Sequence, residues 1–210
     1  QLLKFKRSRL NGRRYPLTMT GWNEEDLAGP DGEDWRVPVS ELAARQQRLG
    51  ELLAKSGISG AFIQHPVDLY YYAGGRQNAS MYIPALGSEH PRSVLFVRRS
   101  LQRAQYEGGG DDAPHEILSF PRMSQLVDAL AQRGVTSAPG LQFGEIPVTY
   151  SERFVKAFSV LGPCPDVTSL IHGQREVKSA WEIEQMDAAA DVQIRMFEAV
   201  EAVGGEGVSE

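Results

Sequence analysis

Short apolar segments alternate with helical patterns between residues 40 and 162, and this alternation limits the folds open to the chain. The run Ser-Val-Leu-Phe-Val at 93–97 is apolar at four successive positions, which is typical of a strand covered on both faces. We predict further strands at 60–64, 115–120 and 141–146, and short strands or strand edges within 68–75 and 79–84. Such alternation indicates an α/β layer structure around a central, largely covered sheet.

Three helices are predicted in the same region from the spacing of their apolar residues. The first follows Ser40, which we take as its N-cap, and places leucines near helical spacing. The second covers about 121–134, and the third covers 149–162. In the third helix, Thr149 and Glu152 have the spacing of a capping box.

Composition agrees with a folded domain that does not enter a membrane. Of 210 residues, 41% are hydrophobic and 23% are charged, as in ordinary globular proteins. The longest apolar runs are about five residues, far below the roughly twenty that a membrane helix requires. Cys164 is the single cysteine, so no disulfide can form within the chain, and we expect a reducing, cytoplasmic location. We interpret Cys164 as a small buried apolar residue.

Charge is distributed unevenly along the chain. Residues 1–18 carry six basic side chains and no acidic one, whereas the remainder carries 16 basic and 27 acidic side chains. The acidic body argues against a nucleic-acid partner, because such binding requires Lys and Arg to neutralise phosphates. The basic leader fits an arm or a transit-like peptide, but we favour an upstream extension with Met19 as the start.

The residues alone do not define a mechanism. The four histidines, His65, His90, His115 and His172, are too far apart in sequence to form a local metal pair. The glycines at 108–110 do not form a dinucleotide fingerprint, and no phosphate-binding loop or metalloprotease motif is present. The acidic residues lie mostly along predicted helix faces and loops.

The segment 175–200 has the strongest helical pattern in the chain. Ser179 and Glu182 have the spacing of a capping box, and the helix should cover about 180–203. Its apolar stripe is formed by Ile183, Met186, Ala190, Ile194 and Phe197. Burying each large apolar side chain is worth about 1.5–3 kcal/mol, whereas a cap contributes about 1 kcal/mol. This helix therefore requires a partner surface.

The same segment carries a resemblance to a known family. Its sequence REVKSAWEIEQMDAAA resembles the R-x-x-K-S-x-x-E-I-x-x-M-x-x-A-A segment that joins the two domains of creatinase, prolidase and aminopeptidase P, the "pita-bread" metallohydrolases. The matching positions are Arg175, Lys178, Ser179, Glu182, Ile183 and Met186. Upstream, the R-x-x-x-L helix after residue 40, the strand at 60–64 and the segment DLYYYAGG are similar to the opening of that family's N-terminal domain.

The resemblance implies a domain plan. It divides the chain into a leader and lead-in at 1–39, an α/β domain with a mixed sheet at 40–173, and a linker with the first catalytic-domain helix at 174–210. It implies a non-catalytic N-terminal domain that builds homodimer contacts and shapes the active-site mouth. The ligands for two divalent metal ions would lie beyond Glu210, so no catalytic or metal residue and no cofactor is assigned within this chain.

The implied parent enzyme is an Xaa-Pro aminopeptidase or dipeptidase that acts on short proline-containing peptides. The segment after Tyr72 departs from the usual peptidase pattern, so a creatinase-like hydrolase of a small non-peptide substrate remains an alternative. A non-catalytic peptide- or histone-binding module of the same fold is a second alternative. In creatinase-like relatives an N-terminal-domain arginine reaches a substrate carboxylate, which makes Arg76 a candidate substrate-binding residue.

Overall fold

The computed structural model describes residues 34–89 and 91–204, and the account below concerns the compact unit Arg36–Glu210. The basic residues 1–18 and His90 lie outside the described residues. Within the described part, no helix is long and apolar enough to cross a membrane.

A four-stranded mixed sheet forms the centre of this unit. Its strands β1 (Gly60–Ile63), β2 (Ala79–Pro84), β3 (Ser93–Val97) and β4 (His115–Ser119) lie side by side in chain order. Strand β2 is antiparallel to both of its neighbours, β1 and β3, and β4 runs parallel to β3. Every residue of β3 is buried, as the apolar run at 93–97 predicts. The predicted α/β fold with a mixed sheet is confirmed.

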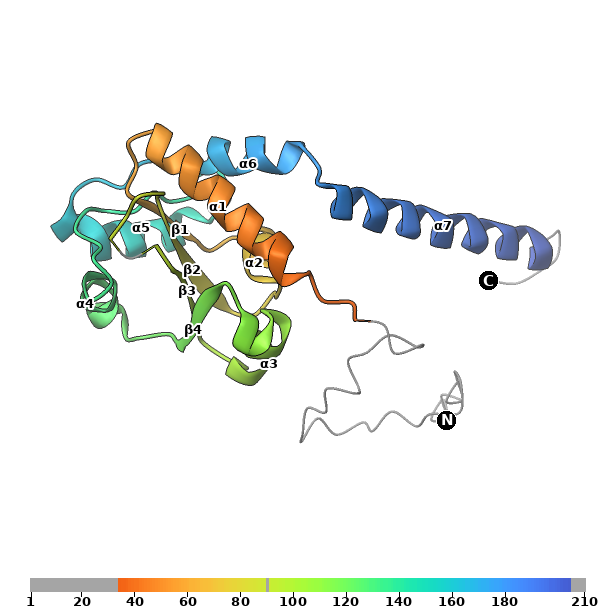
Figure 1. Ribbon diagram of the computed structural model, residues 1–210, viewed down its shortest axis with the longest axis horizontal. Coiled ribbons are helices and arrows are strands. Elements are labelled where there is room, and N and C mark those ends of the chain that lie inside the picture. The colour runs from red at the N-terminus through yellow and green to blue at the C-terminus, as the bar shows by residue number, and fades with distance from the viewer. Residues whose placement is uncertain (1–33, 90, 205–210) are drawn as a thin grey trace. The chain divides into compact units, whose positions relative to one another are not determined.

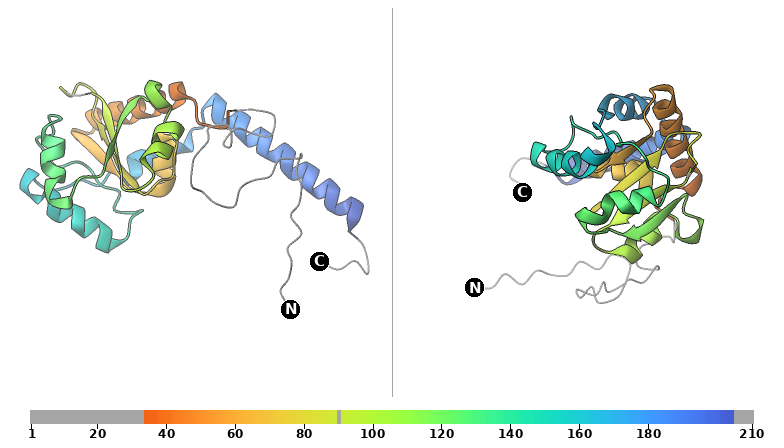
Figure 2. Two further views of the ribbon diagram at one scale, coloured as in Figure 1. Left: turned by 90° about the horizontal axis from the view of Figure 1, so that it is seen from below. Right: turned by 90° about the vertical axis from the view of Figure 1, so that its left-hand side faces the viewer.

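Helices cover both faces of the sheet (Figures 1 and 2). Leu49, Ile63 and Ile171 belong to the core on one face, and Phe62, Leu126 and Phe154 belong to the core on the other. Adjacent strand residues point to opposite faces, so Phe62 and Ile63 contribute to different cores. The helices are α1 (Val39–Lys55), α2 (Pro66–Ala73), α3 (Leu101–Glu107), α4 (Leu126–Ala131), α5 (Val148–Phe158), α6 (Thr168–Glu176) and α7 (Ala180–Val203). Short 3₁₀ helices occur at Gly110–Asp112, Met123–Gln125 and Ser159–Leu161.

The segment that we assigned to strand at 68–75 is instead the helix α2. Pro66 occupies its first turn, where the missing N–H costs nothing, and Gly74 ends it with φ of 77°. A Cβ at Gly74 would lie 2.6 Å from the carbonyl oxygen of Glu107, so only glycine fits this close approach. The three consecutive tyrosines suggested a strand, but the proline and glycine at the two ends determine the outcome.

The predicted strand at 141–146 is also wrong. Backbone pairing there is limited to isolated bridges, from Gly140 to Ala61 and from Leu141 to Asp166. Beyond β1, the side chain of Gln142 replaces a strand partner. Its Oε1 accepts hydrogen bonds from the backbone N–H groups of Gln64 (3.0 Å) and His65 (3.3 Å).

Two predicted helix caps differ from the structure, although the helices themselves are present. Helix α1 begins at Val39 after Pro38, so Ser40 lies inside the helix. Helix α5 begins at Val148 after Pro147 and has no side-chain cap hydrogen bond, so Thr149 forms no capping box. In both cases a proline precedes the first helical residue and sets the start of the helix.

His115 is a buried histidine at the start of β4. Its Nδ1 lies 3.1 Å from the Nε2 amide of Gln46, which is a donor, so Nδ1 accepts and Nε2 carries the hydrogen. Nε2 is buried and has no hydrogen-bond partner among the described residues. Burial, and to a smaller extent the charge of Arg92, lowers the pKa of His115 from 6.5 to about 4.

We therefore expect the free energy of unfolding to fall as the pH drops from about 6.5 to about 4. In that window the unfolded chain binds a proton at His115 and the folded chain does not, which favours unfolding by about 3 kcal/mol at the acidic end. Urea denaturation at several pH values would measure this slope.

The variant His115→Gln provides the test, because glutamine keeps an acceptor for Gln46 but does not titrate. Its unfolding free energy should depend less on pH between 6.5 and 4. An unchanged slope in His115→Gln would show that other groups cause the acid sensitivity.

Candidate functional site

Arg45 lies at the centre of a buried polar network where α1, α2, α6 and the start of α7 meet. The residue is 2% exposed. Its Nε lies 3.0 Å from Glu41 Oε1, and one terminal nitrogen donates to the carbonyl oxygen of Tyr71 at 2.9 Å. The other terminal nitrogen lies 3.4 Å from Oε1 of Glu182, a residue of α7 that follows the linker between α6 and α7. The guanidinium also stacks over the Tyr71 ring, 4.2 Å from its centroid. Its charge is therefore compensated from three directions.

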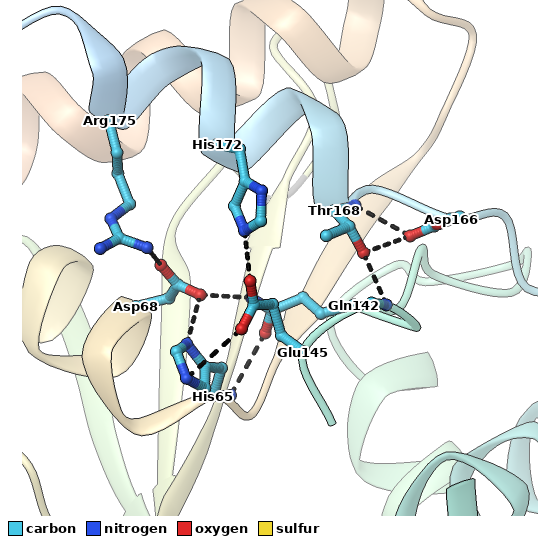
Figure 3. Close-up of polar contacts among 9 residues, drawn as sticks. His65, Asp68, Gln142, Glu145, Asp166, Thr168, His172 and Arg175 are labelled. Carbon is cyan, nitrogen blue, oxygen red and sulfur yellow. Dashed lines mark hydrogen bonds and ion pairs between the residues drawn. The ribbon is translucent and has the colours of Figure 1, made fainter. Parts of the chain in front are cut away.

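Asp68 provides the buried negative charge of the same region and has no exposed surface. Its carboxylate accepts hydrogen bonds from Gln142 Nε2 at 2.6 Å and from a terminal nitrogen of Arg175 at 2.9 Å. His65 Nδ1 lies 3.0 Å away and must be the donor, because a carboxylate only accepts. Figure 3 shows Asp68 between His65 and Arg175. One carboxylate thus joins α2, the 142 loop and α6.

Gln174, next to Arg175 in α6, connects α6 to α1 and α2. Its Nε2 donates to the carbonyl oxygen of Arg45 at 2.9 Å, and its Oε1 accepts from the Tyr72 hydroxyl at 3.0 Å. Burial raises the pKa of Tyr72 well above its ordinary value, so the hydroxyl stays protonated and remains a donor. We call Arg45, Asp68, Gln142, Gln174, Arg175 and Glu182 the junction network.

The junction network holds the linker between α6 and α7 from both ends. Arg175 lies in the last turn of α6, and Glu182 lies in the first turn of α7. Lys178 donates to the carbonyl oxygen of Arg175. The backbone N–H of Ser179 donates to Glu182 Oε2 at 2.9 Å, and the N–H of Glu182 donates to Ser179 Oγ at 3.2 Å, which is the predicted capping box. The direction in which α7 begins is therefore set by several contacts.

A second cluster lies beside Asp68. Glu145 Oε1 lies 2.5 Å from His172 Nε2, and Glu145 Oε2 lies 3.6 Å from His65 Nε2 (Figure 3). His65 thus connects Asp68 and Glu145. Over residues 34–89 and 91–204, no group of His, Cys, Asp and Glu side chains could hold a metal ion. The described residues therefore do not fit the metal pair implied for the parent enzyme, and we derive no catalytic step for them.

Arg76, the predicted substrate-binding residue, lies apart from the junction network, on a hollow of about 390 Å³. Arg98 and Gln64 line the same hollow and were not singled out from the sequence. We call this site the polar hollow. It is lined by Gln64, Pro66, Leu69, residues 76–80, Arg98, residues 145–147 and Tyr150.

The structure separates the six predicted linker positions into four that form polar contacts and two that are exposed. Arg175, Lys178, Ser179 and Glu182 take part in the contacts described above. Ile183 and Met186 are 45% and 55% exposed, and no residue of α7 is buried. Sequence reasoning missed Arg45, Asp68, Gln142 and Gln174 as members of the network. The only signal was the arginine of the R-x-x-x-L helix, which is Arg45.

A family comparison supports this architecture. The sequence profile described as Creatinase/Prolidase N-terminal domain matches residues 45–177. The chain belongs to this family. The match ends at Val177, within the linker held by the junction network. Among curated proteins, no sequence matches the chain.

Solved structures share the fold. An Xaa-Pro dipeptidase from Bacillus anthracis is similar with a TM-score of 0.66 and 17% identity, over 80% of this chain and 45% of its own. Dipeptidase PepE from Mycobacterium ulcerans has a TM-score of 0.62 and 20% identity with the same coverage. A prolidase from Pyrococcus horikoshii has a TM-score of 0.61 and 20% identity, again over 80% and 45%. The chain thus spans less than half the length of these structures.

We expect Arg45→Met to lower the free energy of unfolding by about 3 kcal/mol, because it leaves Glu41, Glu182 and the Tyr71 carbonyl without their buried partner. Amide hydrogen exchange at 179–185 should also become faster, since the first turn of α7 loses its contact with α1. Urea denaturation and exchange measured by mass spectrometry would check both effects.

Arg48→Met is the matched control, because Arg48 lies on the same helix but is exposed. It should change stability by less than about 0.5 kcal/mol. Equal effects of the two substitutions would mean that Arg45 stabilises the chain only through general helix or charge effects.

Proposed function

We propose that this chain is the non-catalytic N-terminal domain of a metal-dependent hydrolase that acts on Xaa-Pro dipeptides or on the N-terminal bond of Xaa-Pro peptides. Family membership supports the domain assignment, and the similar structures are described as Xaa-Pro dipeptidases and prolidases. The remaining length of those structures supports the presence of a second domain in the parent protein.

One observation carries the proposal: the junction network fixes the start of α7 while the apolar stripe of α7 stays exposed. Phe197 is 73% exposed, and Ile183, Met186 and Ile194 are also exposed. Covering four such side chains would be worth about 6–12 kcal/mol. A chain that positions a helix so firmly and leaves its apolar face open is suited to present that helix to another domain.

In this proposal the domain has a positioning role. Arg45 and Asp68 hold the linker, and the linker sets where the catalytic domain begins. The two divalent metal ions and their ligands belong to that catalytic domain, where a metal-bound water would supply the nucleophile. The predicted homodimer and cytoplasmic location are parts of the same proposal.

The decisive experiment compares two proteins: the 210-residue chain, and the same chain extended by the coding sequence downstream of Glu210. With Mn²⁺ present, the extended protein should hydrolyse Ala-Pro and Gly-Pro, while the 210-residue chain should not. A chelator should abolish the activity, and Ala-Ala should be a poor substrate. Light scattering of the extended protein would test the homodimer.

Other outcomes would refute the proposal. Robust hydrolysis by the 210-residue chain would place the chemistry in this domain. If the downstream sequence lacks two Asp, one His and two Glu as metal ligands, the alternative of a non-catalytic binding module is favoured. Hydrolysis of creatine in preference to Ala-Pro would identify the small-substrate alternative.

A further inference from the structure

An open groove lies between α1 and α6, two helices that pack beside each other (Figure 1). We call it the α1–α6 groove. It has a volume of about 420 Å³ and is lined by four residues of α1, from Arg48 to Lys55, and by five residues from Ser169 to Val177. Its apolar residues are Leu52, Leu170 and Val177, and Val177 is 73% exposed. The groove therefore ends at the linker that precedes α7.

Gly173 is the residue of this groove that the fold itself does not require. It lies inside α6, where glycine is less favourable than alanine because its backbone loses more freedom on folding. Its φ is not positive, and a Cβ added there would meet no atom within 4 Å. Neither backbone conformation nor packing among the described residues thus demands a glycine here. Its effect is to leave room above α6 for an occupant that approaches the helix closely.

The polar groups of the lining restrict what such an occupant can be. Gln174 already donates to the carbonyl oxygen of Arg45 and accepts from the Tyr72 hydroxyl. Glu51 accepts from the side chain of Gln47 at 3.0 Å. An extended peptide would bring backbone N–H and C=O groups to a surface with few partners for them. An α-helix pairs these groups within itself, so a helix fits the groove better.

Charge selects among helices. Arg48 and Lys55 are seven positions apart on α1, which places both on the groove side of that helix. Within residues 34–89 and 91–204, neither forms a salt bridge. Glu51 is the single acidic residue of the lining, so the groove carries a net positive charge. Acidic side chains on an incoming helix would be attracted, and basic ones would be repelled.

We propose that the α1–α6 groove binds an amphipathic helix of a partner protein, with an apolar stripe between acidic flanks. The stripe packs on Leu52, Leu170 and Val177, the helix passes close to Gly173, and its carboxylates lie near Arg48 and Lys55. The seven residues from Arg48 to Lys55 correspond to about 10 Å, so the groove holds about two turns of the partner helix. Through Val177 the partner contacts the linker itself.

Binding is tested on the 210-residue chain by fluorescence anisotropy with two synthetic helical peptides of about 16 residues. Both have the same leucine stripe, and its flanks carry glutamate in one (the Glu peptide) and lysine in the other (the Lys peptide). The Glu peptide should bind saturably, and the Lys peptide at least about 10-fold more weakly. Added NaCl should weaken binding of the Glu peptide. Amide chemical shifts should change in α1 and α6 and not at the polar hollow.

Variants then locate the site. Gly173→Leu fills the groove and should weaken binding of the Glu peptide at least about 10-fold, while Tm does not fall, because leucine is the better helix former. Arg48→Met and Lys55→Met should each weaken it about 3-fold. Lys156→Met is the matched control for Lys55→Met, because each lysine is exposed in the last turn of its helix, and Lys156 lies outside the groove. It should leave binding unchanged.

Four results would overturn the proposal. They are the absence of saturable binding at about 1 mM Glu peptide, equal binding of the two peptides, full binding by Gly173→Leu, and equal effects of Lys55→Met and Lys156→Met. A concentration-dependent dimer in light scattering that Gly173→Leu abolishes would also overturn it, since a second copy would then occupy the groove. Because no hydrolysis is measured, failure here leaves the proposed function intact, and failure of the peptidase assay leaves this inference intact.

Discussion

The arrangement of this chain depends on two buried charges, Arg45 and Asp68. Arg45 pairs with Glu41 and Glu182, and Asp68 pairs with Arg175. Each charge is almost fully removed from water, which would cost several kcal/mol without compensation. Compensation comes from groups far apart in sequence: Arg45 needs Glu182, and Asp68 needs Gln142 and Arg175. The sheet, the linker and the start of α7 must therefore be in place together for either charge to be tolerated.

This constraint connects fold to function. An apolar interface at the linker would stabilise it, but apolar contacts are not directional, whereas hydrogen-bonded charges fix orientation. The junction network thus suits a domain that must present α7 in one direction. At the polar hollow the condition is the opposite: among residues 34–89 and 91–204, the buried side-chain amide of Gln64 has no hydrogen-bond partner.

Prediction from the sequence succeeded where a segment contains its own signal. The apolar run at 93–97 became the buried strand β3, and Ser179 and Glu182 formed the capping box of α7. It failed at 68–75, where aromatic residues suggested a strand, although Pro66 and Gly74 delimit a helix. It also failed at 141–146, because the Gln142 side chain, rather than strand pairing, satisfies the backbone beyond β1.

The sequence by itself determined the α/β class and the existence of α7, because periodicity and capping are local properties of neighbouring residues, and it predicts that α7 needs a partner. It also indicated the linker positions Arg175 and Glu182 through a family motif. Only the tertiary structure decided their partners. Arg45 and Glu182 are 137 positions apart, and Gln64 and Arg98 come to line one hollow only when β1, β2 and β3 are assembled. Such contacts depend on the packing of whole elements, which no local pattern encodes.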